Sequence, residues 1–293
     1  THMDPKNRPD RALASIDHER LVTFYRTLGI CVFRIKSVKH LFDMTFTANC
    51  GFTFKKNGEY FVLLSNFRPE RRQGEQKHFQ HFFEFVLRYR RYRVIKLPEY
   101  LYFEGAGDTI PFAGSLLCGY GFRTSQETIP YLYAITRRPV IPLELTEPKI
   151  ESRKTPYHLD TTMTVFDEDR VVIAYSGAFT NSSYELLQRE VCRRNGRLLE
   201  ASYEDAAHMA LNAVVIPKSK ISLHLLPRLS LQKLIEFDLD DILRTQLVEL
   251  VKEIIKNETL RGIVVTSDAA SNALLRTIRS VGYHPITLPL GEF

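Results

Sequence analysis

The feature that most constrains this fold is a unit of helix, apolar strand, polar-tipped strand, hairpin and strand that recurs along the chain. Its first copy runs from an amphipathic helix at 17–29 through CVFRI and TFTANCGFTF to YFVLLSNF, with Asn57-Gly58 predicting the hairpin turn. The polar tips are 59, 52 and 52 residues apart, at Asn49, Asp108, Asp160 and Asn212. Such a unit buries its sheet only against its neighbours, so the repeats predict a ring that brings the polar tips together. The ring implies a shared central site, or alternatively a structural hydrogen-bond network.

The repeats predict one α/β domain over residues 1–293. The expected copies lie at roughly 14–67, 75–122, 126–179, 181–226 and 261–293, with helices near 126–137 and 183–194. In the fourth copy AHMALNAVVI is expected to pair with KISLHLL across a Pro-Lys-Ser turn. Residues 227–257, with helix-spaced apolar positions and mixed charges, predict a helical insertion. The fifth copy is expected to be incomplete, because its polar tip would fall near position 300.

Composition narrows the class of protein. The chain is 44% hydrophobic and 25% charged, which is typical of a globular protein, and no run of about eighteen apolar residues predicts a membrane span. The four cysteines form no CxxC pair, so a reducing intracellular compartment is expected, the cytoplasm by default with an organelle left open. They are Cys31, Cys50, Cys118 and Cys192.

The chain has a net charge of +6 and contains one basic cluster, RYRRYR, which has two interpretations. Arginines interleaved with tyrosines suit phosphates and stacked bases, which would make nucleic acid a partner. The favoured alternative is a cationic helix end that complements the helix dipole. The arginines concerned are Arg88, Arg90, Arg91 and Arg93.

Five strings, FTANCGF, RRQGE, FEGAGD, GYGFRTS and YHLDT, together resemble the pentein guanidino-group-modifying enzymes. That group contains amidinotransferases, dimethylarginine dimethylaminohydrolases, arginine deiminases and arginine dihydrolases. The resemblance implies a fivefold α/β propeller built from ββαβ-type repeats, with the fifth repeat incomplete in this chain. It also implies an arginine-like small molecule as partner, no cofactor and no metal, and it leaves open a homo-oligomer.

The resemblance assigns roles to seven residues. By it, His158 is the general acid/base, Glu104 of FEGAGD is the carboxylate that binds guanidinium or steadies the histidine, and Asp108 lies on the same loop as Glu104. Asp160, two residues from His158 on an expected strand, matches an acid that binds guanidinium. The remaining substrate-binding residues are Asn49, where many members have aspartate, and the carboxylate-gripping Arg72 and Arg123.

The function expected of the parent protein is hydrolysis of a C–N bond of an arginine-type guanidine through a cysteine thiouronium intermediate. By resemblance the nucleophilic cysteine lies just past the LGEF segment, beyond residue 293, and none of the four cysteines matches it. Two alternatives stand beside the hydrolase. One is an amidinotransferase, and the other is a catalytically inactive pentein that binds a ligand, a partner or nucleic acid.

Overall fold

The computed structural model describes residues 10–87, 91–146, 157–221, 241–257 and 259–288. The chain divides into two compact units. Unit 2 spans 34–206, and unit 1 combines residues up to 33 with those from 207 onward. Because each unit has its own core, each is described by itself.

The first sheet of unit 2 begins with the expected hairpin. Strand β1 (Gly51–Lys56) pairs antiparallel with β2 (Glu59–Leu64), and Asn57 and Gly58 have φ of 52° and 84°, so the turn prediction is confirmed. Parallel pairing then adds β3 (Arg93–Ile95). The connection carries α2 (Glu70–Gln73), α3 (Gln76–His81) and the π-helical turn η3 (Phe82–Val86).

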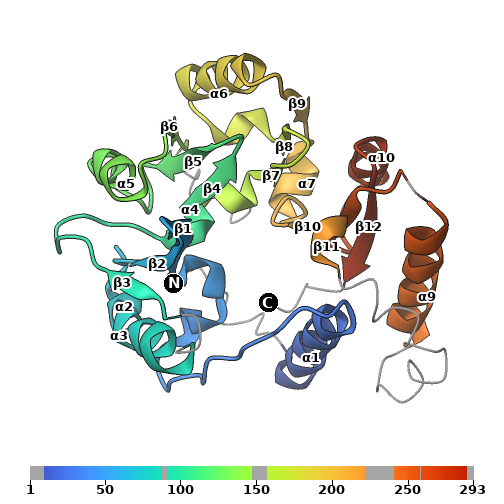
Figure 1. The fold of residues 1–293 in the computed structure, drawn as a ribbon, viewed down its shortest axis with the longest axis horizontal. Coiled ribbons are helices and arrows are strands. Elements are labelled where there is room, and N and C mark those ends of the chain that lie inside the picture. Colours follow the sequence, from blue (N-terminus) through green and yellow to red (C-terminus); the bar gives the residue numbers. More distant parts are fainter. Residues whose placement is uncertain (1–9, 88–90, 147–156, 222–240, 258, 289–293) are drawn as a thin grey trace. The chain divides into compact units, whose positions relative to one another are not determined.

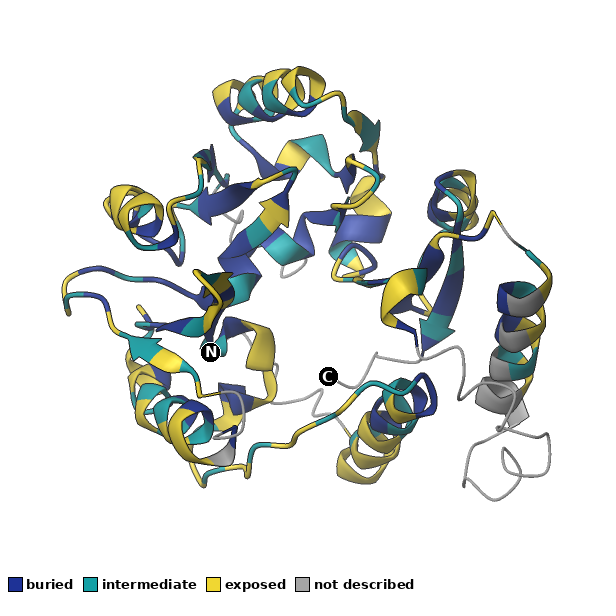
Figure 2. Ribbon diagram, in the orientation of Figure 1, coloured by how far each residue is buried: buried dark blue, intermediate teal, exposed yellow. Residues whose placement is uncertain are grey.

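The next two sheets of unit 2 repeat this order of two antiparallel strands, a helix and a parallel strand (Figure 1). The second sheet consists of β4 (Thr109–Phe112), β5 (Ser115–Tyr120) and β6 (Val140–Glu144), with α5 (Thr128–Thr136) in its crossover. The third consists of β7 (Met163–Phe166), β8 (Val171–Ala174) and β9 (Arg197–Glu200), with α6 (Asn181–Arg193) in its crossover. Figure 2 shows the exposed residues of α5 and α6 on the faces turned away from these sheets.

The strands of unit 2 are apolar because they are buried. All four residues of β8 are buried, and Leu116, Leu117 and Cys118 of β5 are fully buried. Each buried aliphatic side chain contributes roughly 1.5–3 kcal/mol to the free energy of folding. Short helical turns connect the elements: η1 (Phe42–Thr45), η2 (Thr47–Cys50), α4 (Gly105–Asp108), η5 (Leu159–Thr161), η6 (Ser176–Ala178) and α7 (Tyr203–Ala207). Of these, α4 contacts η2, η5, β1 and β4, so it lies where the three sheets meet.

Unit 1 holds one further sheet of the same topology. Strand β10 (Val214–Pro217) pairs antiparallel with β11 (Gly262–Ser267), which pairs parallel with β12 (Tyr283–Leu288) after α10 (Asn272–Ser280). Helices α1 (Arg11–Thr27) and α9 (Asp241–Lys256) complete the unit, α1 packing Phe24 and Leu28 into its apolar core. Asp10 caps α1 by accepting hydrogen bonds from two backbone amides.

The strand pairing of unit 1 differs from the sequence expectation in one respect. The partner of β10 was expected in KISLHLL, yet Lys218–Lys220 form a short helical turn, η7, and β11 takes the partner position. Residues 218–261 separate the two strands of this hairpin in the sequence, so the regular spacing of the repeats does not predict their pairing. Helix α9 agrees with the helical part expected in 227–257, whereas 227–240 lie outside the described residues.

Candidate functional site

Two glycines of FEGAGD let α4 lie directly against its neighbours. Gly105 has φ of +62°, and a Cβ there would lie 2.7 Å from the backbone nitrogen of Gly51. A Cβ on Gly107 would lie 2.1 Å from Nδ2 of Asn49 and 3.7 Å from Oδ2 of Asp160. Asn49 and Asp160, expected to converge, therefore both lie beside this backbone.

The carboxylates of Glu104 and Asp108, at the two ends of α4, hold the imidazole of His158 between them. Its Nδ1 lies 3.0 Å from Oδ1 of Asp108, and its Nε2 lies 3.4 Å from Oε2 of Glu104. All three side chains are almost completely buried. Asp108 is itself oriented, because it accepts hydrogen bonds from the backbone amide of Leu159 and from the hydroxyl of Thr124. The imidazole is thus fixed in one orientation.

The HLDT segment is a helical turn rather than the expected strand. His158 immediately precedes η5, and the hydroxyl of Thr161 donates to the carbonyl of His158 at 2.7 Å. This local hydrogen bond stabilises the turn in place of a strand ladder. Asp160 still lies near His158, since its charge contributes to the pKa of the imidazole.

The pKa of His158 is raised above its ordinary value. Burial alone would lower it, but Asp108 in first place, with Glu104 and Asp160, outweighs burial by stabilising the imidazolium. The imidazole therefore carries its proton to a higher pH than a free histidine. This property suits a group that must deliver a proton near neutral pH.

Arg72 is buried in a network of ion pairs. Its Nε and Nη2 donate to the two oxygens of Glu75 at 3.0 and 2.9 Å, and Nη1 donates to Oε2 of Glu104 at 3.2 Å. Nη2 also donates to the carbonyl of Asp43. Burial raises the pKa of Glu75, and the Arg72 hydrogen bonds oppose that rise. Most donors of Arg72 are therefore already in use within the protein.

Arg123 has a different environment. Its Nη1 donates to both oxygens of Glu104 at 3.1 and 3.3 Å, and its guanidinium lies 5.5 Å from the ring centroid of Phe122 and 5.0 Å from that of Tyr157. The side chain is 6% exposed, and its Nε is buried and makes no hydrogen bond with the described residues. A buried donor without an acceptor costs about 1–3 kcal/mol, so this nitrogen is suited to an incoming anion.

Ion pairs and hydrogen bonds join five of the seven candidate residues. Glu104 pairs with both arginines and lies near His158, which Asp108 binds from the other side. The charge of the sixth, Asp160, raises the pKa of His158. The seventh, Asn49, lies beside Gly107 in α4. Sequence reasoning missed Glu75, Thr124 and Tyr157, although RRQGE, GYGFRTS and YHLDT contain them.

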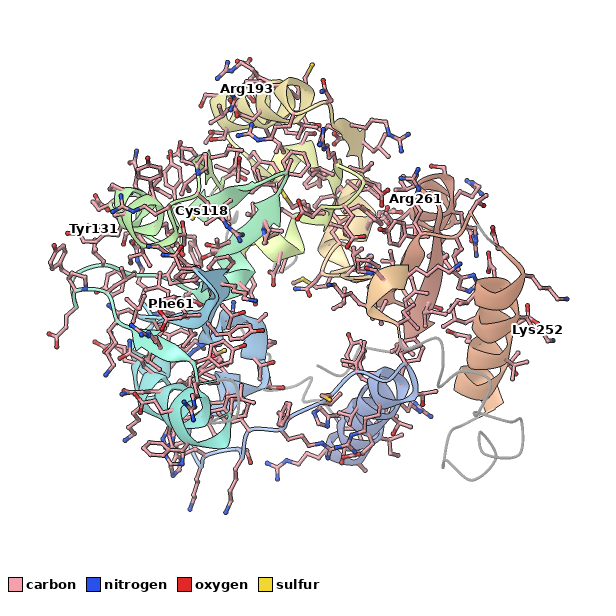
Figure 3. All side chains as sticks on the ribbon, in the orientation of Figure 1. Phe61, Cys118, Tyr131, Arg193, Lys252 and Arg261 are labelled. Atoms are coloured by element: carbon pink, nitrogen blue, oxygen red, sulfur yellow. The ribbon has the colours of Figure 1, made fainter. Side chains whose placement is uncertain are left out.

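Cys50 and Cys118 lie near this network, since the charge of Arg72 acts on the pKa of Cys50 and that of Asp108 on the pKa of Cys118. Burial raises the pKa of both Cys50 and Cys118 to about 12, so their thiols stay protonated at neutral pH. Figure 3 labels Cys118 on β5, where its sulfur contacts the hydroxyl of Thr109. Cys31 and Cys192 are exposed, and no cysteine hydrogen-bonds His158 in the described part of the chain.

The structure describes part of the basic cluster RYRRYR. Arg88 and Arg90 lie outside the described residues, Arg91 is exposed, and Arg93 on β3 pairs with Glu59. Nucleic-acid binding by these arginines stays a prediction.

Within the ranges that the structure describes, no group of histidine, cysteine and acidic residues could hold a metal ion, and no helix is long and apolar enough to cross a membrane.

Known sequences similar to this chain include enzymes that act on arginine derivatives. A dimethylarginine dimethylaminohydrolase of Mycobacterium tuberculosis is 32% identical over 185 residues, covering 63% of this chain and 56% of that protein. A bifunctional arginine dihydrolase/ornithine cyclodeaminase of Synechocystis sp. is 30% identical over 238 residues, covering 80% of this chain and 31% of that protein. The chain thus spans about half of the first relative and less than a third of the second.

Solved structures agree with these sequence matches. The bifunctional enzyme AgrE, in its complex with L-arginine, superposes with a TM-score of 0.72 at 26% identity over 97% of this chain and 34% of that one. A dimethylarginine dimethylaminohydrolase adduct superposes with a TM-score of 0.61 at 16% identity, covering 97% of this chain and 87% of that one. These likenesses show the pentein α/β fold that the sequence motifs implied.

The family itself follows from a match over most of the chain. The family described as eukaryotic N,N dimethylarginine dimethylhydrolase matches residues 2–256, a range that contains every residue of the His158 network. The chain therefore belongs to the N,N dimethylarginine dimethylhydrolase family, within the pentein superfamily.

Proposed function

We propose that this chain binds an arginine-type guanidine and supplies the acid/base part of a hydrolase that cleaves one of its C–N bonds. The observation that carries the proposal is the buried His158, held between Glu104 and Asp108 beside Arg123, whose Nε makes no hydrogen bond. This combination fits the two ends of arginine, a cationic guanidinium and an anionic carboxylate. The activities named for the relatives support the same substrate class.

The charge of the network favours a guanidinium. Four carboxylates, those of Glu75, Glu104, Asp108 and Asp160, accompany two arginines and the imidazolium of His158, so negative charge exceeds positive charge by one among these groups. In a partly desolvated site the excess negative charge attracts a cation more strongly than it would in water. Asn49 adds an amide beside Gly107 that can accept a hydrogen bond without adding charge.

The carboxylate end of the substrate is assigned to Arg123. Since Nη1 already holds Glu104, the Nε edge is the part of this guanidinium that can receive a carboxylate side-on. Arg72, also expected to grip this carboxylate, has its Nε and Nη2 occupied by Glu75 and the Asp43 carbonyl. We therefore propose that Arg72 acts mainly by positioning Glu104.

The proposed reaction has two steps. A cysteine thiolate attacks the guanidinium carbon to form a thiouronium, and the C–N bond breaks as His158 donates its proton to the departing amine. Neutral His158 then takes a proton from water, whose oxygen displaces the thiolate and releases a ureido product. The raised pKa of His158 keeps its proton available for the first step.

The thiolate is assigned to a cysteine that residues 1–293 do not include. Cys50 and Cys118 are protonated at neutral pH, and Cys31 and Cys192 are exposed. The same observation favours a second candidate function, a guanidine-binding protein without catalysis. Both candidates require the pocket to bind arginine, and turnover by the full-length protein distinguishes them.

The test is calorimetric titration of the 293-residue chain with L-arginine and with agmatine, which lacks the α-carboxylate. We expect weak binding of arginine, weaker binding of agmatine, and loss of arginine binding in Asp160→Ala. Arg123→Met should remove the preference for arginine, whereas Arg189→Met, which alters an exposed arginine on α6, should keep it. Equal affinity for the two ligands in the unmodified chain would contradict the assignment of Arg123.

A further inference from the structure

Thr124 is a fully buried residue whose hydroxyl contacts both ends of the α4 turn. Its oxygen accepts a hydrogen bond from the backbone amide of Glu104 at 3.2 Å, and its proton is donated to Oδ2 of Asp108 at 2.7 Å. Glu104 and Asp108 are the residues whose carboxylates flank the imidazole of His158. One hydroxyl therefore links the two neighbours of the acid/base group.

Backbone hydrogen bonds hold the segment around Thr124 in place. The amide of Gly121 donates to the carbonyl of Thr124 at 2.9 Å, and the amide of Ser125 donates to the carbonyl of Tyr102 at 3.0 Å. The hydroxyl of Ser125 accepts a hydrogen bond from the amide of Tyr102 in return. Because the chain is fixed on both sides of Thr124, its hydroxyl stays in one place beside Asp108.

Both oxygens of the Asp108 carboxylate face hydrogen-bond donors. Oδ2 accepts from Thr124, and Oδ1 accepts from the backbone amide of Leu159 at 3.2 Å. Oδ1 also lies 3.0 Å from Nδ1 of His158. An aspartate is normally ionised at neutral pH, and an ionised carboxylate can only accept hydrogen bonds. Nδ1 of His158 must therefore carry a proton, since a bare ring nitrogen would repel a carboxylate oxygen at this distance.

The position of Asp108 decides which nitrogen of His158 keeps its proton when the ring becomes neutral. A neutral imidazole retains one proton, and the hydrogen bonds of its two nitrogens select where that proton lies. Nδ1 makes the shorter contact, 3.0 Å to Asp108, whereas Nε2 lies 3.4 Å from Oε2 of Glu104. The Glu104 carboxylate is also shared with Arg72 and Arg123. The neutral ring should therefore keep the proton on Nδ1 and exchange the other proton at Nε2.

We propose that Thr124 is a positioning residue for the acid/base chemistry: by holding Asp108, it keeps a proton on Nδ1 of His158 and leaves Nε2 to donate and accept the proton of the reaction. This inference rests on the acid/base role proposed for His158. The proton given to the departing amine leaves from Nε2, and the proton taken from water returns to Nε2. A neutral ring with its proton on Nε2 could not accept one there, so the second step would stop.

The test is nitrogen-15 nuclear magnetic resonance of the His158 ring in the 293-residue chain, at a pH where the ring is neutral. The chemical shifts distinguish a protonated ring nitrogen from a bare one, and His158→Gln identifies the resonances. In the unmodified chain, the form with its proton on Nδ1 should exceed the other about tenfold or more, because it hydrogen-bonds a carboxylate. Thr124→Val removes the hydroxyl and lets Asp108 rotate, so this ratio should fall at least about threefold. Thr124→Ser keeps a hydroxyl and should restore the ratio.

Thr128→Val is the matched control. Thr128 is also fully buried, and its hydroxyl donates at 2.9 Å to the carbonyl of Tyr102 and not to a carboxylate beside His158. This variant loses a buried hydroxyl from the same part of the chain, yet the proton of His158 should stay on Nδ1. An equal change in Thr128→Val and Thr124→Val would overturn the proposal, because any lost hydroxyl would then move the proton.

The unmodified chain alone can also contradict the proposal, if its neutral His158 has the proton mainly on Nε2. An unchanged ratio in a folded Thr124→Val variant would overturn it too, as would a Thr124→Ser variant that behaves like Thr124→Val. Circular dichroism and thermal unfolding establish folding, and Thr124→Ala replaces Thr124→Val where the latter does not fold. The resonance measurement needs no ligand, so its failure concerns Thr124, whereas failure of arginine to bind in calorimetry concerns the proposed function.

Discussion

Single residues explain why the site tolerates little change. Glu104 binds Nη1 of both Arg72 and Arg123 and also lies 3.4 Å from His158, so one carboxylate fixes three cationic groups. The FEGAGD motif identifies Glu104 and Asp108 from sequence. By contrast, Glu75 joins the network through Arg72, whose Nη1 reaches Glu104 32 residues away, a contact that residue spacing does not reveal.

Replacing His158 should change how stability depends on pH. The folded-state pKa of His158 is raised, so its imidazolium stabilises the fold fully below the unfolded pKa of about 6.5. This contribution disappears as pH rises through the folded-state pKa. The free energy of unfolding of the unmodified chain should therefore fall relative to His158→Gln over that interval, as measured by urea unfolding at a series of pH values.

The exposed His18 of α1 provides the matched control. His18→Gln removes an exposed imidazole outside the network, and its unfolding is measured at the same pH values. The raised pKa predicts that the free energy of unfolding of the unmodified chain falls relative to that of His158→Gln as pH rises. A difference that stays constant, or that grows in favour of the unmodified chain, would contradict it.

Adding one methyl group at Gly107 should damage the site more than the fold. The new Cβ would meet Nδ2 of Asn49 at 2.1 Å, so the amide must move from its position beside Gly107. Overpacking of this kind destabilises a protein by about 1–3 kcal/mol. We expect Gly107→Ala to bind arginine at least about tenfold more weakly, since displacement of about 1 Å is enough to disrupt a positioned site.

Gly74→Ala is the comparison, because its Cβ would meet only the flexible end of Leu41 at 3.3 Å and its φ is −67°. Its stability should change by no more than about 0.5 kcal/mol. Calorimetry and thermal unfolding measure both variants. Unchanged arginine binding in Gly107→Ala would remove Asn49 from the site.

Elements of secondary structure were predictable where the spacing between them was regular. The Asn57-Gly58 hairpin and the crossover helices near 126–137 and 183–194 correspond to the β1–β2 turn, α5 and α6. The strand partner of β10 could not be found by the same spacing, because the segment after Pro217 separates it from β11. The expected strand at HLDT failed for a local reason, the hydrogen bond between Thr161 and the His158 carbonyl.

The short helices α2 and α3 depend on one buried ion pair. Glu75 is fully buried and binds Arg72 through both oxygens. A neutral residue at position 75 leaves Arg72 paired with Glu104, so the cost is that of weakening two charged hydrogen bonds, each of which contributes about 1.5–3 kcal/mol. Glu75→Gln should therefore lower the free energy of unfolding by about 3 kcal/mol, whereas Glu70→Gln, at an exposed position of α2, should leave it nearly unchanged.

The ion pair between Arg72 and Glu75 should also affect the protonation of His158. With Glu75 neutral, Arg72 should bind Glu104 more strongly and draw it from His158, so the pKa of His158 should fall. Nuclear magnetic resonance titration of the imidazole measures this change. A destabilised Glu75→Gln variant whose His158 pKa is unchanged would mean that Glu75 supports the fold without positioning the site.

At the scale of the whole molecule, family membership and the His158 network lead to the same substrate class. The family was recognisable from sequence because five motifs occur in order, and the fold followed from the family. The motifs could not predict the protonation of His158, because it depends on burial and on the charges of Asp108 and Glu104. The unpaired Nε of Arg123 likewise depends on how Glu104 occupies Nη1.

The 293-residue chain should bind its substrate without converting it. Its two buried thiols have a pKa of about 12, so they supply almost no thiolate at pH 7. We expect no citrulline or ornithine above background from arginine, dimethylarginine or agmatine, as measured by amino-acid analysis after prolonged incubation. Turnover that disappears in Cys50→Ser or Cys118→Ser would show that one of these thiols is the nucleophile.

The central claim is that an arginine guanidinium binds beside His158, and the imidazole itself reports on it. The measurement is a pH titration of the His158 ring resonance, identified by its absence in His158→Gln, with and without saturating L-arginine. Without ligand the pKa should lie above its ordinary value of about 6.5. A bound guanidinium places a second cation near the ring, so arginine should lower that pKa, whereas glycine should not. A His158 pKa that arginine leaves unchanged, under conditions where calorimetry detects binding, would contradict the claim.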